Sequence, residues 1–144
     1  MRVVLDTNTL VAAFLSSSGP HRRILELGIA GRFSLHTSET LLAELADVFS
    51  RSKFAGRLAA AGLTAEGIVN DVRLLSHLET PDPDFPPTIL DDPDDDAVLA
   101  CADTARATLI VSGDHHLLDL RAFRGMSILP PTEALAVLAG LPHP

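Results

Sequence analysis

The chain has little that would cross-link it or anchor it. It contains a single cysteine, Cys101, so no disulfide framework is available. Cys101 lies in an apolar helical pattern, and we expect a packed core thiol there. No apolar run approaches the roughly 20 residues that a membrane-spanning helix needs. The N-terminal apolar run is short and is interrupted by Asp6, unlike a signal peptide. We therefore expect a soluble, cytoplasmic protein.

Two familiar catalytic signatures are also missing from the sequence. A phosphate-binding P-loop is absent, because Gly113 is a lone turn glycine without the glycine-lysine pattern around it. No serine, histidine and aspartate form a recognisable nucleophilic set. Neither P-loop phosphate binding nor serine catalysis is therefore indicated.

Charge is unevenly distributed along a chain whose formal net charge is −8. Residues 1–57 carry seven basic and five acidic side chains, whereas residues 58–144 carry four arginines and fourteen acids. This acidity argues against passive coating of nucleic acid but allows an enzyme whose carboxylates are neutralised by bound metal. Arg51, Lys53 and Arg57 form a local basic segment, which is either a contact for phosphates or a solvated helix end.

The alternation of short apolar runs with amphipathic segments predicts an α/β protein. Strands are expected at residues 2–5, 32–36, 109–111 and 126–129, with a fifth short strand at 89–90. Helices are expected at residues 9–15, 21–30, 38–49, 52–61, 64–78, 96–104 and 132–139. Such alternation indicates a parallel sheet, here of four or five strands, with right-handed crossovers. The length of 144 residues fits a single domain spanning residues 1–144.

Carboxylates occur where this sheet would present a ligand. Asp6 and Asp114 each follow a predicted strand, and the carboxyl ends of parallel strands meet at one edge of an open sheet. Glu44 borders the apolar face of its helix, where it either faces the same edge or is an ordinary surface glutamate. Converging carboxylates repel one another unless a hard cation lies between them. This pattern predicts Mg²⁺ or Mn²⁺ and phosphate chemistry.

Residues 91–96 hold five aspartates in six positions, which exceeds what helix capping requires. The alternative is capping combined with solvated loop charge. We expect at least one of these aspartates to bind metal. Asp96 is the first choice, because Leu99 and Ala100 follow it at i+3 and i+4 in the helix, and Asp95 is the second.

Three short polar side chains accompany these acids. Thr7 and Asn8 would orient Asp6 or a metal-bound water, or would simply cap the first helix. Ser112 would contact a phosphate or a metal-bound water, or would simply end a strand. His115 and His116 follow Asp114, but a histidine pair without further ligands at metal spacing is a weak signal. We attribute this pair to the polarity of a surface helix.

Four segments together resemble the PIN-domain ribonucleases, and most closely the toxin-like (VapC-like) branch of prokaryotic toxin–antitoxin pairs. The segments are VVLDTNTLVAAF, SETLLAELADVF, DDPDDDAVLACA and LIVSGDHHLL, in this order along nearly the whole chain. The resemblance implies a three-layer α/β/α sandwich and Mg²⁺- or Mn²⁺-dependent cleavage of single-stranded RNA. It also implies frequent homodimers and a small antitoxin partner that inserts beside the active site.

The resemblance further implies which residues act. Asp6, Glu44, Asp96 and Asp114 would form the acidic catalytic and metal-binding site, with Thr7, Asn8 and Ser112 nearby and Asp95 as the alternative to Asp96. Glu44 would either bind a second ion or position the attacking water.

Two other functions are consistent with the same acids. A Mg²⁺-dependent phosphomonoesterase would use an aspartyl nucleophile with a second aspartate two residues on, but Asn8 occupies that position and the only lysine is Lys53. A non-catalytic module that binds RNA or a protein would keep the acids for structure alone.

Overall fold

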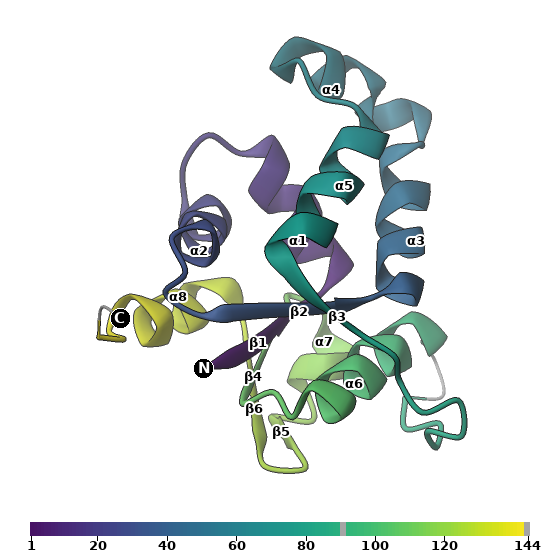
Figure 1. Ribbon diagram of the computed structural model, residues 1–144, viewed down its shortest axis with the longest axis vertical. Coiled ribbons are helices and arrows are strands. Elements are labelled where there is room, and N and C mark those ends of the chain that lie inside the picture. The colour runs from purple at the N-terminus through teal and green to yellow at the C-terminus, as the bar shows by residue number, and fades with distance from the viewer. Residues whose placement is uncertain (90–91, 143–144) are drawn as a thin grey trace.

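A six-stranded sheet with helices on both faces organises the molecule (Figure 1). The computed structural model describes residues 1–89 and 92–142. Its strands are β1 (Arg2–Leu5), β2 (Ser34–Ser38), β3 (Ser76–Glu79), β4 (Leu109–Val111), β5 (Ala122–Phe123) and β6 (Met126–Leu129). Its helices are α1 (Thr7–Leu15), α2 (Pro20–Ile29), α3 (Glu39–Phe49), the 3₁₀ helix η1 (Ser52–Phe54), α4 (Ala55–Ala61), α5 (Ala65–Leu75), α6 (Pro93–Ala105), α7 (His115–Leu118) and α8 (Pro131–Ala139).

The strand order is β3-β2-β1-β4-β6-β5, and every neighbouring pair is parallel except β5 with β6. The prediction of an α/β fold with a mainly parallel sheet between helices is therefore confirmed. β1 pairs with β2 on one side and with β4 on the other, and these two strands come from distant parts of the sequence. β1 is consequently a central strand, and its carboxyl end lies in the middle of one sheet edge.

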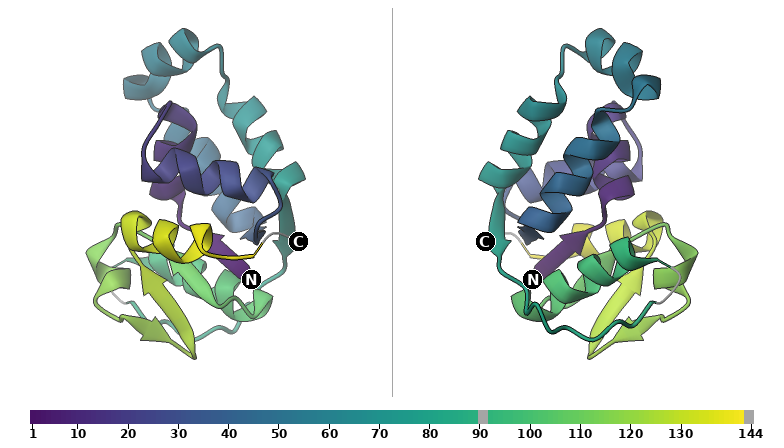
Figure 2. Two further views of the ribbon diagram at one scale, coloured as in Figure 1. Left: turned by 90° about the vertical axis from the view of Figure 1, so that its left-hand side faces the viewer. Right: turned by 90° about the vertical axis from the view of Figure 1, so that its right-hand side faces the viewer.

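The alternation of side chains along the central strand produces two cores. In β1, Val3 and Leu5 belong to the core beneath α1, α2, α3, α5 and α8, whereas Val4 belongs to the core beneath α6 and α7. Figure 2 shows these helical layers on opposite sides of the sheet. Because both faces are covered, β4 and residues Val3–Leu5 of β1 are uniformly apolar, as expected for buried parallel strands.

Cys101 lies on α6 and is fully buried in the second core, so the prediction of a packed thiol is confirmed. Burial raises the pKa of Cys101 to about 12, which keeps it in the unreactive thiol form. Among the described residues, no helix has the length and apolar character needed to cross a bilayer.

The sheet has two strands that the sequence analysis did not predict. The segment predicted as a helix at 64–78 ends as α5 at Leu75, and β3 then pairs with β2. Here tertiary pairing outweighs helical periodicity, and the His77 ring stacks on that of His36 at a centroid distance of 4.8 Å. The predicted strand at 89–90 is not observed at Ile89, and residue 90 lies outside the described residues.

The second missed strand, β5, belongs to a short hairpin with β6. Arg124 and Gly125 form its two-residue turn with φ angles of 48° and 82°. A turn with positive φ at both positions suits the twist of a hairpin but usually has Asn, Asp or Gly at its first position. Because arginine occupies that position, the sequence does not indicate the hairpin. The hairpin lies at one end of the molecule and α4 at the other (Figures 1 and 2).

Adjacent residues of α8 offer a matched test of the packing. Leu138 is fully buried against the first core, whereas Val137 is 41% exposed. Leu138→Ala should lower the free energy of unfolding by about 2–5 kcal/mol, because it removes buried methyl groups and leaves a cavity. Val137→Ala should change it by less than about 1 kcal/mol. Urea unfolding measures both values, and equal effects would contradict the packing of α8.

Candidate active site

A polar hollow of about 190 Å³ opens at the carboxyl ends of β1 and β4. This is the sheet edge at which open α/β folds bind ligands. Three chain segments contribute most of its walls: the start of α1, the middle of α3 and the start of α6. The lining residues are Asp6, Thr7, Asn8, Glu44, Val48, Arg51, Asp92, Asp94, Asp95, Val98 and Asp114.

Asp6 ends β1 and caps the first turn of α1. Its Oδ1 accepts a hydrogen bond from the Thr9 backbone N–H at 2.9 Å, and its Oδ2 accepts one from the Ser112 hydroxyl. Its own backbone N–H donates to the Val111 carbonyl of β4 at 3.1 Å. Burial raises the pKa of Asp6, although the hydrogen bonds from Ser112 and Thr9 oppose that rise. Asp6 is thus a fixed carboxylate in a poorly solvated position.

Ser112 joins the two strand-end aspartates. This fully buried residue follows β4, and its Oγ also accepts a hydrogen bond from the Asp114 backbone N–H at 2.9 Å. Asp114 in turn caps α7 by accepting a hydrogen bond from the His116 backbone N–H at 2.8 Å. The prediction that Asp6 and Asp114 would meet at one sheet edge agrees with this arrangement. Ser112 fixes their separation, which its sequence position alone did not reveal.

In the structure, Asp95 and not Asp96 lines the hollow. Asp96 Oδ1 accepts the backbone N–H groups of Thr88 and Ile89, at 3.0 and 2.8 Å, and so holds the loop that precedes α6. The choice of Asp96 as the residue facing the site is corrected accordingly. Asp95 lies one position earlier, on the buried face of α6 that continues through Val98, and only 6% of it is exposed.

Asp95 lies in an environment that disfavours its charged form. Burial, followed by the charges of Asp114 and Asp92, raises the pKa of Asp95 to about 8. Within residues 1–89 and 92–142, its Oδ2 atom is buried and has no hydrogen-bond partner. An unpartnered buried oxygen is costly, so this atom points to a ligand that satisfies it.

Glu44 reaches the hollow from α3, on the opposite wall to α6. It is partly buried, and this burial raises the pKa of Glu44, with smaller contributions from the charges of Asp94, Asp6 and Asp92. The reading of Glu44 as an ordinary surface glutamate is therefore not favoured. Thr7, which opposes that pKa rise, and Asn8 line the hollow from the first turn of α1.

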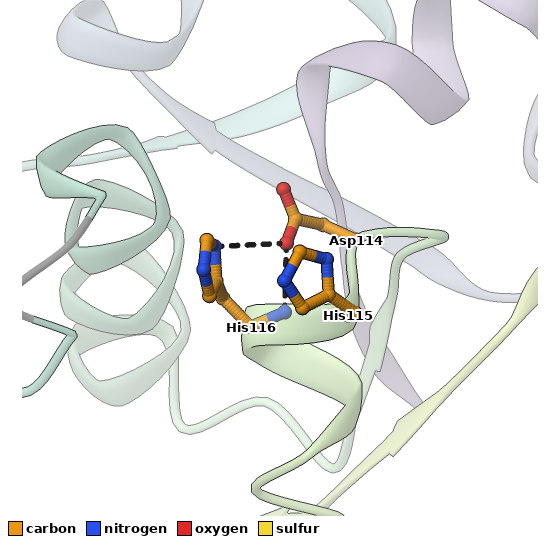
Figure 3. A group of neighbouring side chains, drawn as sticks. All are labelled: Asp114, His115 and His116. Carbon is orange, nitrogen blue, oxygen red and sulfur yellow. Dashed lines mark hydrogen bonds and ion pairs between the residues drawn. The ribbon is translucent and has the colours of Figure 1, made fainter.

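His116 was missed by the sequence reasoning, which attributed it to helix polarity. Because Asp114 caps α7, the ring of His116 folds back over the Asp114 carboxylate, with Nδ1 at 3.4 Å from Oδ1 (Figure 3). Asp92 and Asp94 were also not singled out within the acidic run, yet both line the hollow. The sequence did contain a signal for His116: a strand, a turn and then Asp-His-His. If the aspartate caps the following helix, the second histidine lies next to its carboxylate.

The donor set fits a divalent cation. One ligand atom from each of Asp92, Asp95, Asp114 and His116 lies within 4.8 Å of all the others. Carboxylate oxygens are the preferred ligands of Mg²⁺ and Mn²⁺. Asp95 Oδ2, which accepts no hydrogen bond from the described residues, has lone pairs free to bind such an ion. This cluster of aspartate and histidine is therefore able to hold a metal ion.

Comparison with known families agrees with this geometry. The sequence pattern of the PIN domain matches residues 2–116, which is most of the chain. The chain belongs to the PIN-domain family. Asp6, Glu44, Asp95 and Asp114 all lie within the matched PIN-domain segment.

Comparison with solved structures adds a relative of the same fold. A chain in the crystal structure of VapBC2 from Rickettsia felis bound to a DNA fragment from their promoter is 20% identical, with a TM-score of 0.56. The alignment covers 90% of this PIN domain chain and 98% of that chain, and it shows a shared fold. A comparison with curated proteins found no match.

The raised pKa of Asp95 predicts how the metal-free protein responds to pH. The folded state holds this proton more tightly than the unfolded chain, so the resulting stability is complete at low pH and is lost as pH rises through about 8. The melting temperature should therefore fall between pH 6 and pH 9. Mg²⁺ should raise it more at pH 9, because protons then compete less for the carboxylates.

Differential scanning fluorimetry measures both effects. Asp95→Asn should reduce the fall between pH 6 and pH 9, because the amide does not titrate. A wild-type melting temperature that rises over this interval would contradict the assigned environment of Asp95.

Proposed function

We propose that this PIN-domain protein is a metal-dependent endoribonuclease that hydrolyses phosphodiester bonds of single-stranded RNA. The observation that supports it most is the convergence of Asp6, Asp95 and Asp114 at one sheet edge, with Glu44 opposite, in a hollow that exposes polar atoms. Carboxylates gathered in this way serve phosphate chemistry when a divalent cation offsets their repulsion.

Asp95 and Asp114 would bind the cation, which we propose is Mg²⁺ or Mn²⁺, with the Asp6 carboxylate beside them as a near-direct ligand and Glu44 lining the same hollow. When bound, such an ion lowers the pKa of a coordinated water and offsets charge on the leaving oxygen. The protein keeps the ligands in position: Ser112 and the Thr9 N–H hold both oxygens of Asp6, and the cap of α7 holds Asp114. These contacts reduce the reorganisation that binding requires.

Glu44 and Arg51 would act on water and substrate. The raised pKa of Glu44 brings this carboxylate closer to the range in which it accepts a proton from an attacking water. Arg51 lines the same hollow, and its ion pair with Asp47, at 3.3 Å, is exposed on both sides. An exposed pair of this kind is weak, so Arg51 is available to bind a phosphate of the RNA backbone.

We also propose that the protein is the toxin of a cytoplasmic toxin–antitoxin pair, forms a homodimer and binds a small antitoxin protein. Its fold relative belongs to a VapBC2 assembly, which supports a protein partner. An apolar hollow lined by Phe14, Ile29, Leu74 and Leu75 supports it as well, because Leu74 is 85% exposed. Exposed apolar surface of this kind commonly marks a protein contact.

Asp6→Asn tests the reaction. Asparagine keeps an oxygen for the Thr9 N–H but removes the charge that a cation requires, so Mg²⁺-dependent RNA cleavage should fall by about 100-fold or more. The melting temperature without metal should change little, because removal of a buried charge offsets loss of the hydrogen bond from the Ser112 hydroxyl. The matched control is Asp84→Asn, an exposed loop position, which should cleave RNA like the wild type.

Cleavage is measured on mixed RNAs with Mg²⁺, Mn²⁺ or EDTA, with p-nitrophenyl phosphate as a second substrate. If Asp6→Asn cut RNA as fast as the parent protein, the proposed mechanism would be refuted. Activity on p-nitrophenyl phosphate without activity on RNA would replace it with a phosphomonoesterase.

The adjacent pair Asp95→Asn and Asp96→Asn separates the two roles in α6. Asp95→Asn should abolish metal-dependent cleavage, because Asp95 faces the hollow. Asp96→Asn should retain cleavage within about 10-fold, since an amide oxygen still accepts the N–H groups of Thr88 and Ile89. Initial rates and melting temperatures measure both variants. The reverse pattern would return the site to Asp96.

A further inference from the structure

His116 carries a side-chain nitrogen into the acidic hollow. Its Nδ1 atom lies 3.4 Å from Asp114 Oδ1, 3.8 Å from Asp95 Oδ2 and 4.0 Å from Asp92 Oδ2. These carboxylates come from α6 with its N-cap residue Asp92 and from the turn before α7, two segments that are separated in the sequence. The imidazole nitrogen and one oxygen from each of the three carboxylates therefore form a cluster of four possible ligand atoms, called the ring below.

The spacing of this ring matches a single coordination shell. All four atoms lie within 4.8 Å of one another. Metal–ligand bonds of about 2.1 Å place two ligands on opposite sides of one ion about 4.2 Å apart. Small side-chain rotations would bring the four atoms to that spacing, since each belongs to a terminal group that turns about a single bond.

Two buried polar atoms of the ring make no hydrogen bond to the described residues. Within the part of the chain that the structure describes, neither His116 Nδ1 nor Asp95 Oδ2 has a hydrogen-bond partner. The side chain of Asp95 is only 9% exposed, so water satisfies its inner oxygen poorly. Buried polar atoms are rarely left without a partner, and here two of them face the same point.

The local structure fixes the His116 ring in this orientation. The backbone N–H of His116 donates to Asp114 Oδ1 at 2.8 Å, so residue 116 lies beside that carboxylate. The His115 ring also lies beside it, at a centroid distance of 4.1 Å (Figure 3). His115 is exposed and does not belong to the group that includes Asp92 and Asp95.

We propose that His116 is a metal ligand together with Asp92, Asp95 and Asp114, and that its imidazole makes the site prefer a first-row transition ion such as Mn²⁺ over Mg²⁺. The proposal rests on the metal site of the proposed function and concerns which ion occupies it. Mg²⁺ takes oxygen ligands almost exclusively, whereas imidazole nitrogen is a good ligand for transition ions. Three carboxylates alone would not make this distinction.

Electron paramagnetic resonance of Mn²⁺ bound to the full-length protein tests the ligand directly. Pulsed spectra of the wild type should show modulation from a directly bound ¹⁴N nucleus. The modulation should vanish in His116→Gln and persist in His115→Ala, which is the matched control. Absence of ¹⁴N modulation in the wild type, or its loss in His115→Ala and not in His116→Gln, would overturn the proposal.

Binding titrations test the selectivity. His116→Gln should weaken Mn²⁺ binding by about 10–100-fold and Mg²⁺ binding, measured by competition, by less than about 3-fold. Equal losses for both ions would show that His116 supports the carboxylates without binding the metal. His116→Ala is a second variant if the first fails to fold, and the wild-type spectrum decides the ligand in either case.

The outcomes are distinguishable from those for the ribonuclease. ¹⁴N modulation in a protein that cuts no RNA with any ion would support His116 as a ligand and refute the proposed activity. RNA cleavage in Mg²⁺ without ¹⁴N modulation would do the opposite.

Discussion

The parallel pairing of β1 with β4 is the constraint on which the site depends. It places Asp6 and Asp114 at neighbouring strand ends, and the hydroxyl of Ser112 then binds both, accepting from one and donating to the other. Because β1 and β4 are central strands with apolar residues on both faces, the sheet holds the backbones of both strand ends side by side. Protonation or a bound cation would relieve the repulsion between the carboxylates that gather there.

The acids of the hollow come from both faces of the sheet. Glu44 belongs to a helix of one layer, and Asp95 to the helix that covers the opposite face. The hollow is therefore complete only when the helices of both layers are folded. A divalent ion that binds there would stabilise the folded state over the unfolded chain by mass action, which couples occupancy of the site to the free energy of unfolding.

The strand ends were predictable because a buried β-run followed by a polar residue has one simple interpretation, and Asp6 and Asp114 were found from it. The phase of α6 was not. Asp95 and Asp96 differ by one helical step, and the choice depends on Thr88 and Ile89, whose backbone binds Asp96. The position of the His116 side chain in the hollow was not predictable either, because it depends on the capping of α7 by Asp114 and not on residue spacing. β3 was not predicted because its pairing with β2 is a long-range contact. β5 was not predicted because Arg124 occupies a turn position that seldom holds arginine.

The tether between Asp96 and the loop before α6 restricts how this region can vary. Each residue of a helix turns its side chain by about 100° relative to the previous one. Insertion or deletion of a single residue between Pro93 and Asp96, inside the first turn of α6, would either break the tether or turn another aspartate toward the hollow. The acids at the start of α6 reduce the cost of such a change, because the shifted helix still presents a carboxylate to the hollow.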